Sequence, residues 1–224
     1  MNTRLITISK ARLLDLAAAS PLIVWYAFAI AGLAMQVGGQ IATSTDPARL
    51  ALSAGAKLAA AAFLGLQIVL FVIRRLPVGK AEGWWPRILA VFGANAAIIF
   101  LALPRVELSP LLNVVSSVLI IGGSVGAFVI ASRLGRAFSV LPQARSLVTD
   151  GPYRFVRHPL YVAEQVATFG IMWQFQQPWA LMVALLSLAA QFPRMHYEEQ
   201  ILAQTFPSYR AYAERTARLI PGVY

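Results

Sequence analysis

Residues 21–41 read PLIVWYAFAIAGLAMQVGGQI and contain no charged side chain. A helix rises about 1.5 Å per residue and the hydrocarbon core of a bilayer is roughly 30 Å thick, so this stretch is about long enough to cross it. Three more apolar stretches follow, at about residues 50–73, 86–103 and 111–132. The pattern predicts four transmembrane helices.

The composition of the 224-residue chain agrees with a membrane protein. Hydrophobic residues make up 58% of it and charged residues 12%, against roughly 45–50% and about 25% in soluble domains. Cysteine is absent and there are two histidines, so disulfides and thiolate sites are excluded and we expect no metal site. The net charge of +10 is spread between apolar blocks. It favours contact with membrane lipids and not with nucleic acid.

The C-terminal part has a different pattern. Residues 133–157 contain five arginines and no apolar run long enough to cross a bilayer, which predicts a surface loop. Two shorter apolar stretches, at about 161–173 and 179–192, predict a helical hairpin that enters the membrane and returns. A polar, helical tail is expected from Arg194 onward.

The predicted fold class is therefore all-α, a polytopic membrane helix bundle. It has four full spans in residues 1–132, and residues 133–224 add the loop, hairpin and polar helix within one single domain. An N-terminus on the cytoplasmic side places 16 of the 19 Lys and Arg residues on that side. Because cytoplasmic loops collect these residues, we expect the N-terminus, loop and tail in the cytoplasm and the chain in a bacterial inner membrane.

Two polar segments flank the hairpin. Residues 147–161 read LVTDGPYRFVRHPLY, and residues 194–199 read RMHYEE. Taken alone, each has a plain structural explanation, since Asp-Gly-Pro is an ordinary turn and His-Pro suits a helix start. Ionisable groups at the edge of apolar helices are costly to bury, so their concentration where two helix ends meet indicates a functional site.

Together these segments resemble the signature of the isoprenylcysteine carboxyl methyltransferase and phospholipid methyltransferase families, over about the last 90 residues. The resemblance implies S-adenosylmethionine as cofactor, bound by the loop and tail, and a lipophilic small molecule or lipid as substrate. It implies that Arg194 lies on the acceptor side, and that Arg194, Glu198 and His158 are catalytic. Glu164 is a further candidate for the acceptor side, because it is a carboxylate one helical turn after Leu160, at the start of an apolar helix. The implied cofactor contacts are Gln143, Leu147, Val148, Tyr153, His158, Pro159, Leu160, Tyr161 and Glu198.

The expected reaction is transfer of a methyl group to a lipophilic acceptor at the membrane interface. Arg194 favours a carboxylate, as in the isoprenylcysteine carboxyl O-methyltransferases, because a guanidinium binds a carboxylate bidentately. The alternatives are phospholipid N-methylation and small-thiol S-methylation. Those acceptors require a base, for which Glu198, Glu164 and His196 are candidates.

Two other classes of function stay open. Membrane sterol and enone reductases resemble the same C-terminal half and use NADPH, whose phosphates Arg133, Arg136 and Arg145 could contact. A small membrane transporter or scaffold would need functional polar groups near the bilayer midplane, where the sequence has few, chiefly Asn95 and Gln67.

Overall fold

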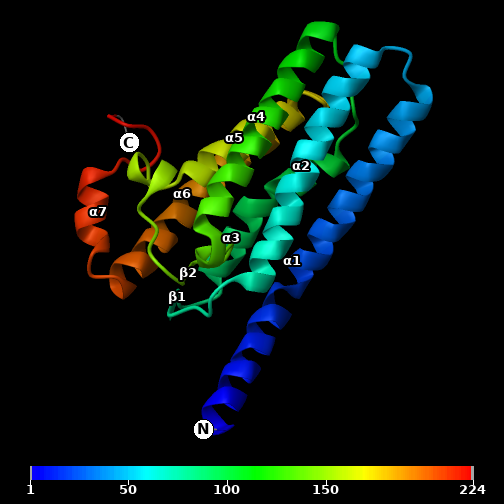
Figure 1. The fold of residues 1–224 in the computed structure, drawn as a ribbon. Helices are drawn as coiled ribbons and strands as arrows, with labels where there is room; N and C mark the ends of the chain where they lie inside the picture. Colours follow the sequence, from blue (N-terminus) through cyan, green and yellow to red (C-terminus); the bar gives the residue numbers. More distant parts are fainter. Residues whose placement is uncertain (1, 223–224) are drawn as a thin grey trace.

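The computed structural model describes residues 2–222, and these form a bundle of helices (Figure 1). The helices are α1 (Asn2–Thr43), α2 (Pro47–Ile73), α3 (Trp85–Asn95), α4 (Pro110–Leu134), α5 (Pro159–Met172), α6 (Trp179–Thr205) and α7 (Tyr209–Arg215), with 3₁₀ segments η1 (Ala96–Ala102), η2 (Gly135–Ala137) and η3 (Gly151–Arg154). Two short antiparallel strands, β1 (Gly79–Lys80) and β2 (Gln143–Ala144), join the α2–α3 and α4–α5 connections. The predicted all-α polytopic membrane bundle is confirmed.

Four segments are long and apolar enough to cross a membrane: Lys10–Thr43, Pro47–Ile73, Trp85–Ala102 and Pro110–Ala137. Local sequence sets their ends. The Asp46 carboxylate accepts hydrogen bonds from the backbone N–H groups of Ala48 and Arg49 at 3.0 and 3.1 Å, and a proline occupies the first turn of both α2 and α4. Side-chain N-caps and N-terminal prolines both favour a helix start.

The structure corrects the predicted boundaries at two places. The first helix begins well before Pro21, at Asn2, and in this polar extension the Asp15 carboxylate pairs with the Arg74 guanidinium at 2.8 Å. The third span has the predicted bounds, but it consists of α3 completed by a 3₁₀ segment, η1. The second hairpin helix does not stop at Phe192 but continues through Pro193 to Thr205. Neighbouring helices allow such a proline inside a membrane helix.

Helices α4 and α5 approach each other closely at Gly123 and Gly170. A Cβ atom at Gly123 would lie 2.4 Å from the backbone nitrogen of Ala167, and one at Gly170 would lie 2.8 Å from Ile120. Small residues allow this kind of contact between membrane helices. The contact fixes α5, and with it the start of the hairpin, against the fourth span.

We predict that Gly123→Ala lowers the thermal stability of the protein in detergent. The added methyl group would overlap the α5 backbone, and overpacking of this kind destabilises proteins by about 1–3 kcal/mol. Gly122→Ala is the matched control, because nothing lies within 4 Å of a Cβ at Gly122. Equal melting temperatures for the two variants would contradict the close approach.

A polar hollow of about 340 Å³ lies at the end of the bundle where α1 turns into α2. Its lining comes from this turn and from the start of α4, and includes Gln40, Asp46, Arg49 and Asn113. It shares no residue with the two motif segments. At the other end, Asp15 of α1 pairs with Arg74 and Arg145, and β1 pairs with β2.

Candidate functional site

The α5–α6 hairpin brings the two polar motifs together. The His158 ring nitrogen Nε2 lies 2.9 Å from Glu199 Oε1, and the Tyr161 hydroxyl donates a hydrogen bond of 2.5 Å to Glu198 Oε2. His158 is the N-cap residue of α5, and Pro159 fills the first helical position. The juxtaposition expected from the hairpin is therefore observed.

Glu199 is the shared partner of three basic side chains. Besides His158, Arg157 Nη1 lies 3.2 Å from Glu199 Oε1, and Arg218 Nη2 lies 2.6 Å from Oε2. Burial alone would raise the pKa of this carboxyl, but hydrogen bonds from His158 and Arg218, together with the Arg157 charge, lower it to about 2. Glu199 is thus a carboxylate at all physiological pH values.

The C-terminal segment is tied to the same loop. The backbone N–H of Arg157 donates to the Ala217 carbonyl at 2.8 Å, and that of His158 donates to the Arg218 carbonyl at 3.1 Å. The Tyr212 hydroxyl of α7 donates to the Tyr153 carbonyl at 2.7 Å. Through these bonds the segment after α6 folds back over η3 and the start of α5.

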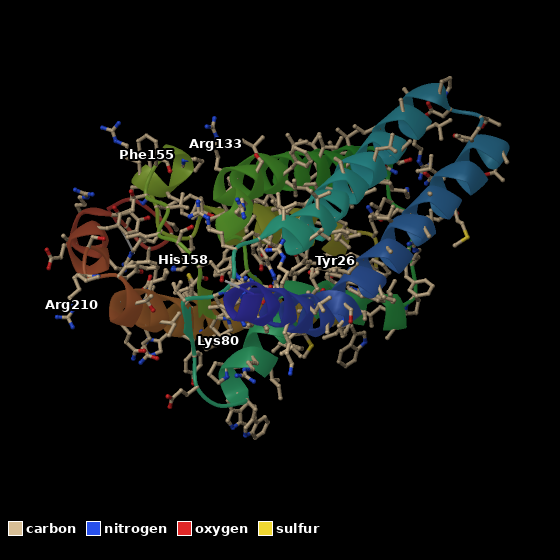
Figure 2. The ribbon with its side chains drawn as sticks, turned by 60° about the horizontal axis from the view of Figure 1, so that its bottom comes forward. Tyr26, Lys80, Arg133, Phe155, His158 and Arg210 are labelled. Atoms are coloured by element: carbon tan, nitrogen blue, oxygen red, sulfur yellow. The ribbon has the colours of Figure 1, made fainter. Side chains whose placement is uncertain are left out.

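Aromatic rings form much of the interior of this region. The His158 and Tyr161 rings stack with their centroids 5.1 Å apart, and Tyr153 is 7% exposed. Burial raises the pKa of Tyr153 well above its ordinary value, so its hydroxyl stays protonated. The Tyr209 hydroxyl is buried without a hydrogen-bond partner. Figure 2 shows His158 in the interior, whereas Arg133 and Arg210 point outward.

A second charged pair lies deeper in the bundle. Arg194 is 4% exposed, and its Nη1 lies 3.6 Å from Glu164 Oε2 of α5. Its guanidinium sits 4.3 Å from the centroid of the Tyr161 ring, and Nη1 donates to Gln191 Oε1 at 3.2 Å. Arg194 and Glu164, both predicted from the sequence, are therefore neighbours.

Other predicted residues have different surroundings. Leu160 is buried in the first turn of α5, while Leu147 and Val148 are half-buried in the loop that follows β2. Gln143 lies in β2, where its side-chain carbonyl accepts a hydrogen bond of 2.7 Å from Arg145. His196 is exposed and packs edge-on against Tyr197. The structure thus gives His196 no place in the buried cluster.

Sequence reasoning missed Glu199 and Arg218 as members of the site. The resemblance to known families indicates Glu198 and not Glu199. Because neighbouring residues of a helix point in directions about 100° apart, the two glutamates cannot share the same surroundings. Only the tertiary structure shows that Glu199 meets three basic groups and that Arg218 reaches back from the chain's end. Two adjacent glutamates facing an Arg-His dipeptide are the signal that would have indicated a second carboxylate partner.

We predict that low pH reduces the free energy of unfolding because Glu199 becomes protonated. Its pKa falls from an ordinary value of 4.5 to about 2 on folding, so its stabilisation is complete above pH 4.5 and is lost as the pH falls toward 2. The shift corresponds to up to about 3 kcal/mol. Melting temperatures of the wild type and Glu199→Gln, measured from pH 7 to pH 3, should converge at low pH. A constant difference between them would contradict this assignment.

Comparison with known proteins supports the motif analysis. Residues 111–208, from the start of α4 to the end of α6, match the model of the phospholipid methyltransferase family. The resemblance indicated by the two motifs is confirmed. The matched segment includes Glu164, Arg194, Glu198 and Glu199, but not Asp15 or the C-terminal Arg218.

Two curated proteins are similar to parts of the chain. The cobalt-zinc-cadmium resistance protein CzcN of Cupriavidus metallidurans is 35% identical over 77 residues, which is 34% of this chain and 36% of that protein. The nickel-cobalt-cadmium resistance protein NccN of Alcaligenes xylosoxydans xylosoxydans is 30% identical over 112 residues, which is 48% of this chain and 52% of that protein. The chain spans about half or less of the length of these relatives. Among residues 2–222, no group of three or more His, Cys, Asp or Glu side chains is placed to hold a metal ion.

Proposed function

We propose that this protein is a multi-pass membrane methyltransferase that transfers the methyl group of S-adenosylmethionine to a lipophilic acceptor. The observation that supports this most directly is the meeting of the histidine-proline segment with the twin glutamates, through His158–Glu199 and Tyr161–Glu198. The match of residues 111–208 to the phospholipid methyltransferase family supports the same chemistry.

The residues of the cluster fit the proposed donor. When bound, S-adenosylmethionine supplies a methyl group on a positively charged sulfur, next to an amino acid group and an adenine. Such a molecule is bound by carboxylate, polar and aromatic groups in a largely enclosed site. The cluster has the Glu198 carboxylate, the stacked His158 and Tyr161 rings, and the unpartnered, buried Tyr209 hydroxyl.

Each group of this chain has a distinct task in the proposal. Glu198, oriented by the Tyr161 hydroxyl, presents its carboxylate to the polar part of the donor. Glu199 fixes the His158 ring, because the Nε2–H group donates to its Oε1. The folded-back C-terminal segment is held to Tyr153 by the Tyr212 hydroxyl, and its proposed task is to exclude water. Alignment and exclusion of water are the main contributions that a protein makes to a displacement of this kind.

The three arginines suggested as phosphate contacts of an NADPH-dependent reductase have other surroundings in the structure. Arg145 is 4% exposed; it pairs with Asp15 and donates to the Arg75 carbonyl and to Gln143. Arg136 donates to the Ile73 carbonyl at the end of α2. These two side chains stabilise the end of a helix, and Arg133 points away from the bundle (Figure 2). These three arginines therefore do not form a shared site for the phosphates of NADPH.

Binding measurements with the purified protein in detergent test the proposal. Isothermal titration calorimetry should detect S-adenosylmethionine and give no signal with NADPH. We predict that Glu198→Gln weakens donor binding at least tenfold, because a charge-assisted contact is worth about 1.5–3 kcal/mol. Glu107→Gln is the control, since Glu107 is exposed and lies outside the cluster. Binding of NADPH alone would overturn the proposal.

A further inference from the structure

The buried Arg194–Glu164 pair carries information about the acceptor. The two groups lie 3.6 Å apart, and the side chains are 4% and 17% exposed. Tyr26 of α1 is buried in the same cluster as Tyr161, and Arg194 Cδ lies 3.4 Å from the position of a Cβ atom at Gly93 of α3. Helices α1, α3, α5 and α6 therefore surround this charged pair inside an otherwise apolar bundle.

The positive charge of Arg194 is already opposed at this site. The Glu164 carboxylate lies 3.6 Å from the guanidinium, and Glu198 acts on it at longer range. Adding an anionic acceptor would bring a further negative group to one buried guanidinium, and like charges at close range are strongly unfavourable in such surroundings. The pair favours an acceptor that is uncharged or that can give up a proton.

Hydrogen bonding at the site leads to the same conclusion. Glu164 Oε2 is buried, and its ion-pair partner Arg194 Nη1 lies at 3.6 Å, beyond hydrogen-bond distance; Arg194 Nε is buried without a hydrogen-bond partner. A buried polar group without a partner costs about 1–3 kcal/mol. A ligand that donates a hydrogen bond to Glu164 would remove this cost. A carboxylate has no hydrogen to donate, whereas an amine or a thiol does.

The pair is also adjacent to the proposed donor site. Tyr161 contacts both, because its hydroxyl bonds to Glu198 while its ring faces Arg194. Glu164 and Glu198 are close enough to interact electrostatically. A nucleophile held at Glu164 would thus lie beside the group that binds the methyl donor.

We propose that Glu164 is the proton acceptor of the reaction and that the methyl acceptor is a protic nucleophile, an amine or a thiol on an apolar body. This inference rests on the proposed methyltransferase function. The nitrogen or sulfur of the acceptor forms a bond to the methyl carbon, and the bond from that carbon to the sulfonium sulfur breaks with its electron pair staying on sulfur. An alkylamine is an ammonium ion near pH 7, since its pKa is close to the value of about 10.4 for a lysine side chain. One proton therefore passes from the ammonium or the thiol to the Glu164 carboxylate before the new bond forms, which frees the lone pair that attacks, and the proton goes from Glu164 to water.

A set of acceptors that share one tail tests the inference. Dodecylamine, dodecanethiol and dodecanoate are incubated with the wild-type protein and methyl-labelled S-adenosylmethionine, and the products are identified by mass spectrometry. We expect the amine or the thiol to be methylated at least ten times faster than the acid, and the faster of the two identifies the acceptor class. Faster methylation of dodecanoate, or no turnover of any of the three, overturns the inference.

Glu164→Gln separates proton transfer from a structural role. In this variant turnover of the preferred acceptor should fall at least tenfold at pH 7, while its affinity for S-adenosylmethionine in calorimetry stays within twofold of the wild type. With dodecanethiol its rate should recover as the pH rises, because the thiol then ionises without a base. A rate equal to the wild type, or a loss that pH does not relieve, overturns the role of Glu164. Absence of donor binding by the wild type would instead reject the proposed function itself.

Discussion

Asp15→Asn is expected to destabilise the protein by about 3 kcal/mol, because it breaks a buried ion pair from one side. The Asp15 carboxylate faces two guanidiniums, with Arg74 Nε at 2.8 Å and Arg145 Nη2 at 2.9 Å. The two arginine side chains are 3% and 0% exposed, so water cannot solvate their guanidiniums once the carboxylate charge is lost. Both would keep hydrogen bonds to backbone carbonyls, which limits the loss.

Thermal or denaturant unfolding in detergent measures this effect, and Asp46→Asn is the matched control. Asp46 caps α2 through two backbone N–H groups, and asparagine caps a helix about as well as aspartate. The control should therefore unfold like the wild type. If both variants unfold together, the three-way pairing at Asp15 does not stabilise the protein.

Glu199→Ala is expected to weaken S-adenosylmethionine binding at least thirtyfold. The substitution removes the common partner of Arg157, His158 and Arg218, leaving three basic groups close together. The His158 ring loses its fixed orientation, and the segment around Arg218 loses its side-chain attachment to α6. A thirtyfold loss corresponds to about 2 kcal/mol, within the range for a buried, charged hydrogen-bond partner.

Calorimetry gives the affinity for this variant, and hydrogen exchange of residues 209–220 shows whether the C-terminal segment opens. Glu214→Ala in α7 serves as the control, since Glu214 is exposed. We expect faster exchange in Glu199→Ala only. Unchanged affinity together with unchanged exchange would contradict the positioning role that the ion pairs give to Glu199.

The helices and the meeting of the two motifs could be predicted because they follow from local pattern. Long apolar runs indicated the four spans, and a hairpin of two short apolar stretches returns His158 toward Glu199. The polar contacts of α1 and the C-terminal segment could not be predicted. Asp15 and Arg145 are 130 residues apart in the sequence, and no periodicity links positions so distant.

The roles of individual charged residues were also hidden from the sequence. Arg145 could have been a phosphate ligand, but the structure buries it against Asp15 at the end of α2. Arg194 could have been free to bind an anion, but the Glu164 carboxylate of α5 lies 3.6 Å from its guanidinium. In both cases a partner from a different element decides the chemistry, and such pairings are a property of packing.

The close contact of α4 with α5 at Gly123 and Gly170 limits the routes by which the proposed lipophilic acceptor could reach Glu164. Backbone lies against backbone there, so no hydrocarbon chain can slip between these two helices. Passage from the bilayer must therefore use another boundary of the bundle.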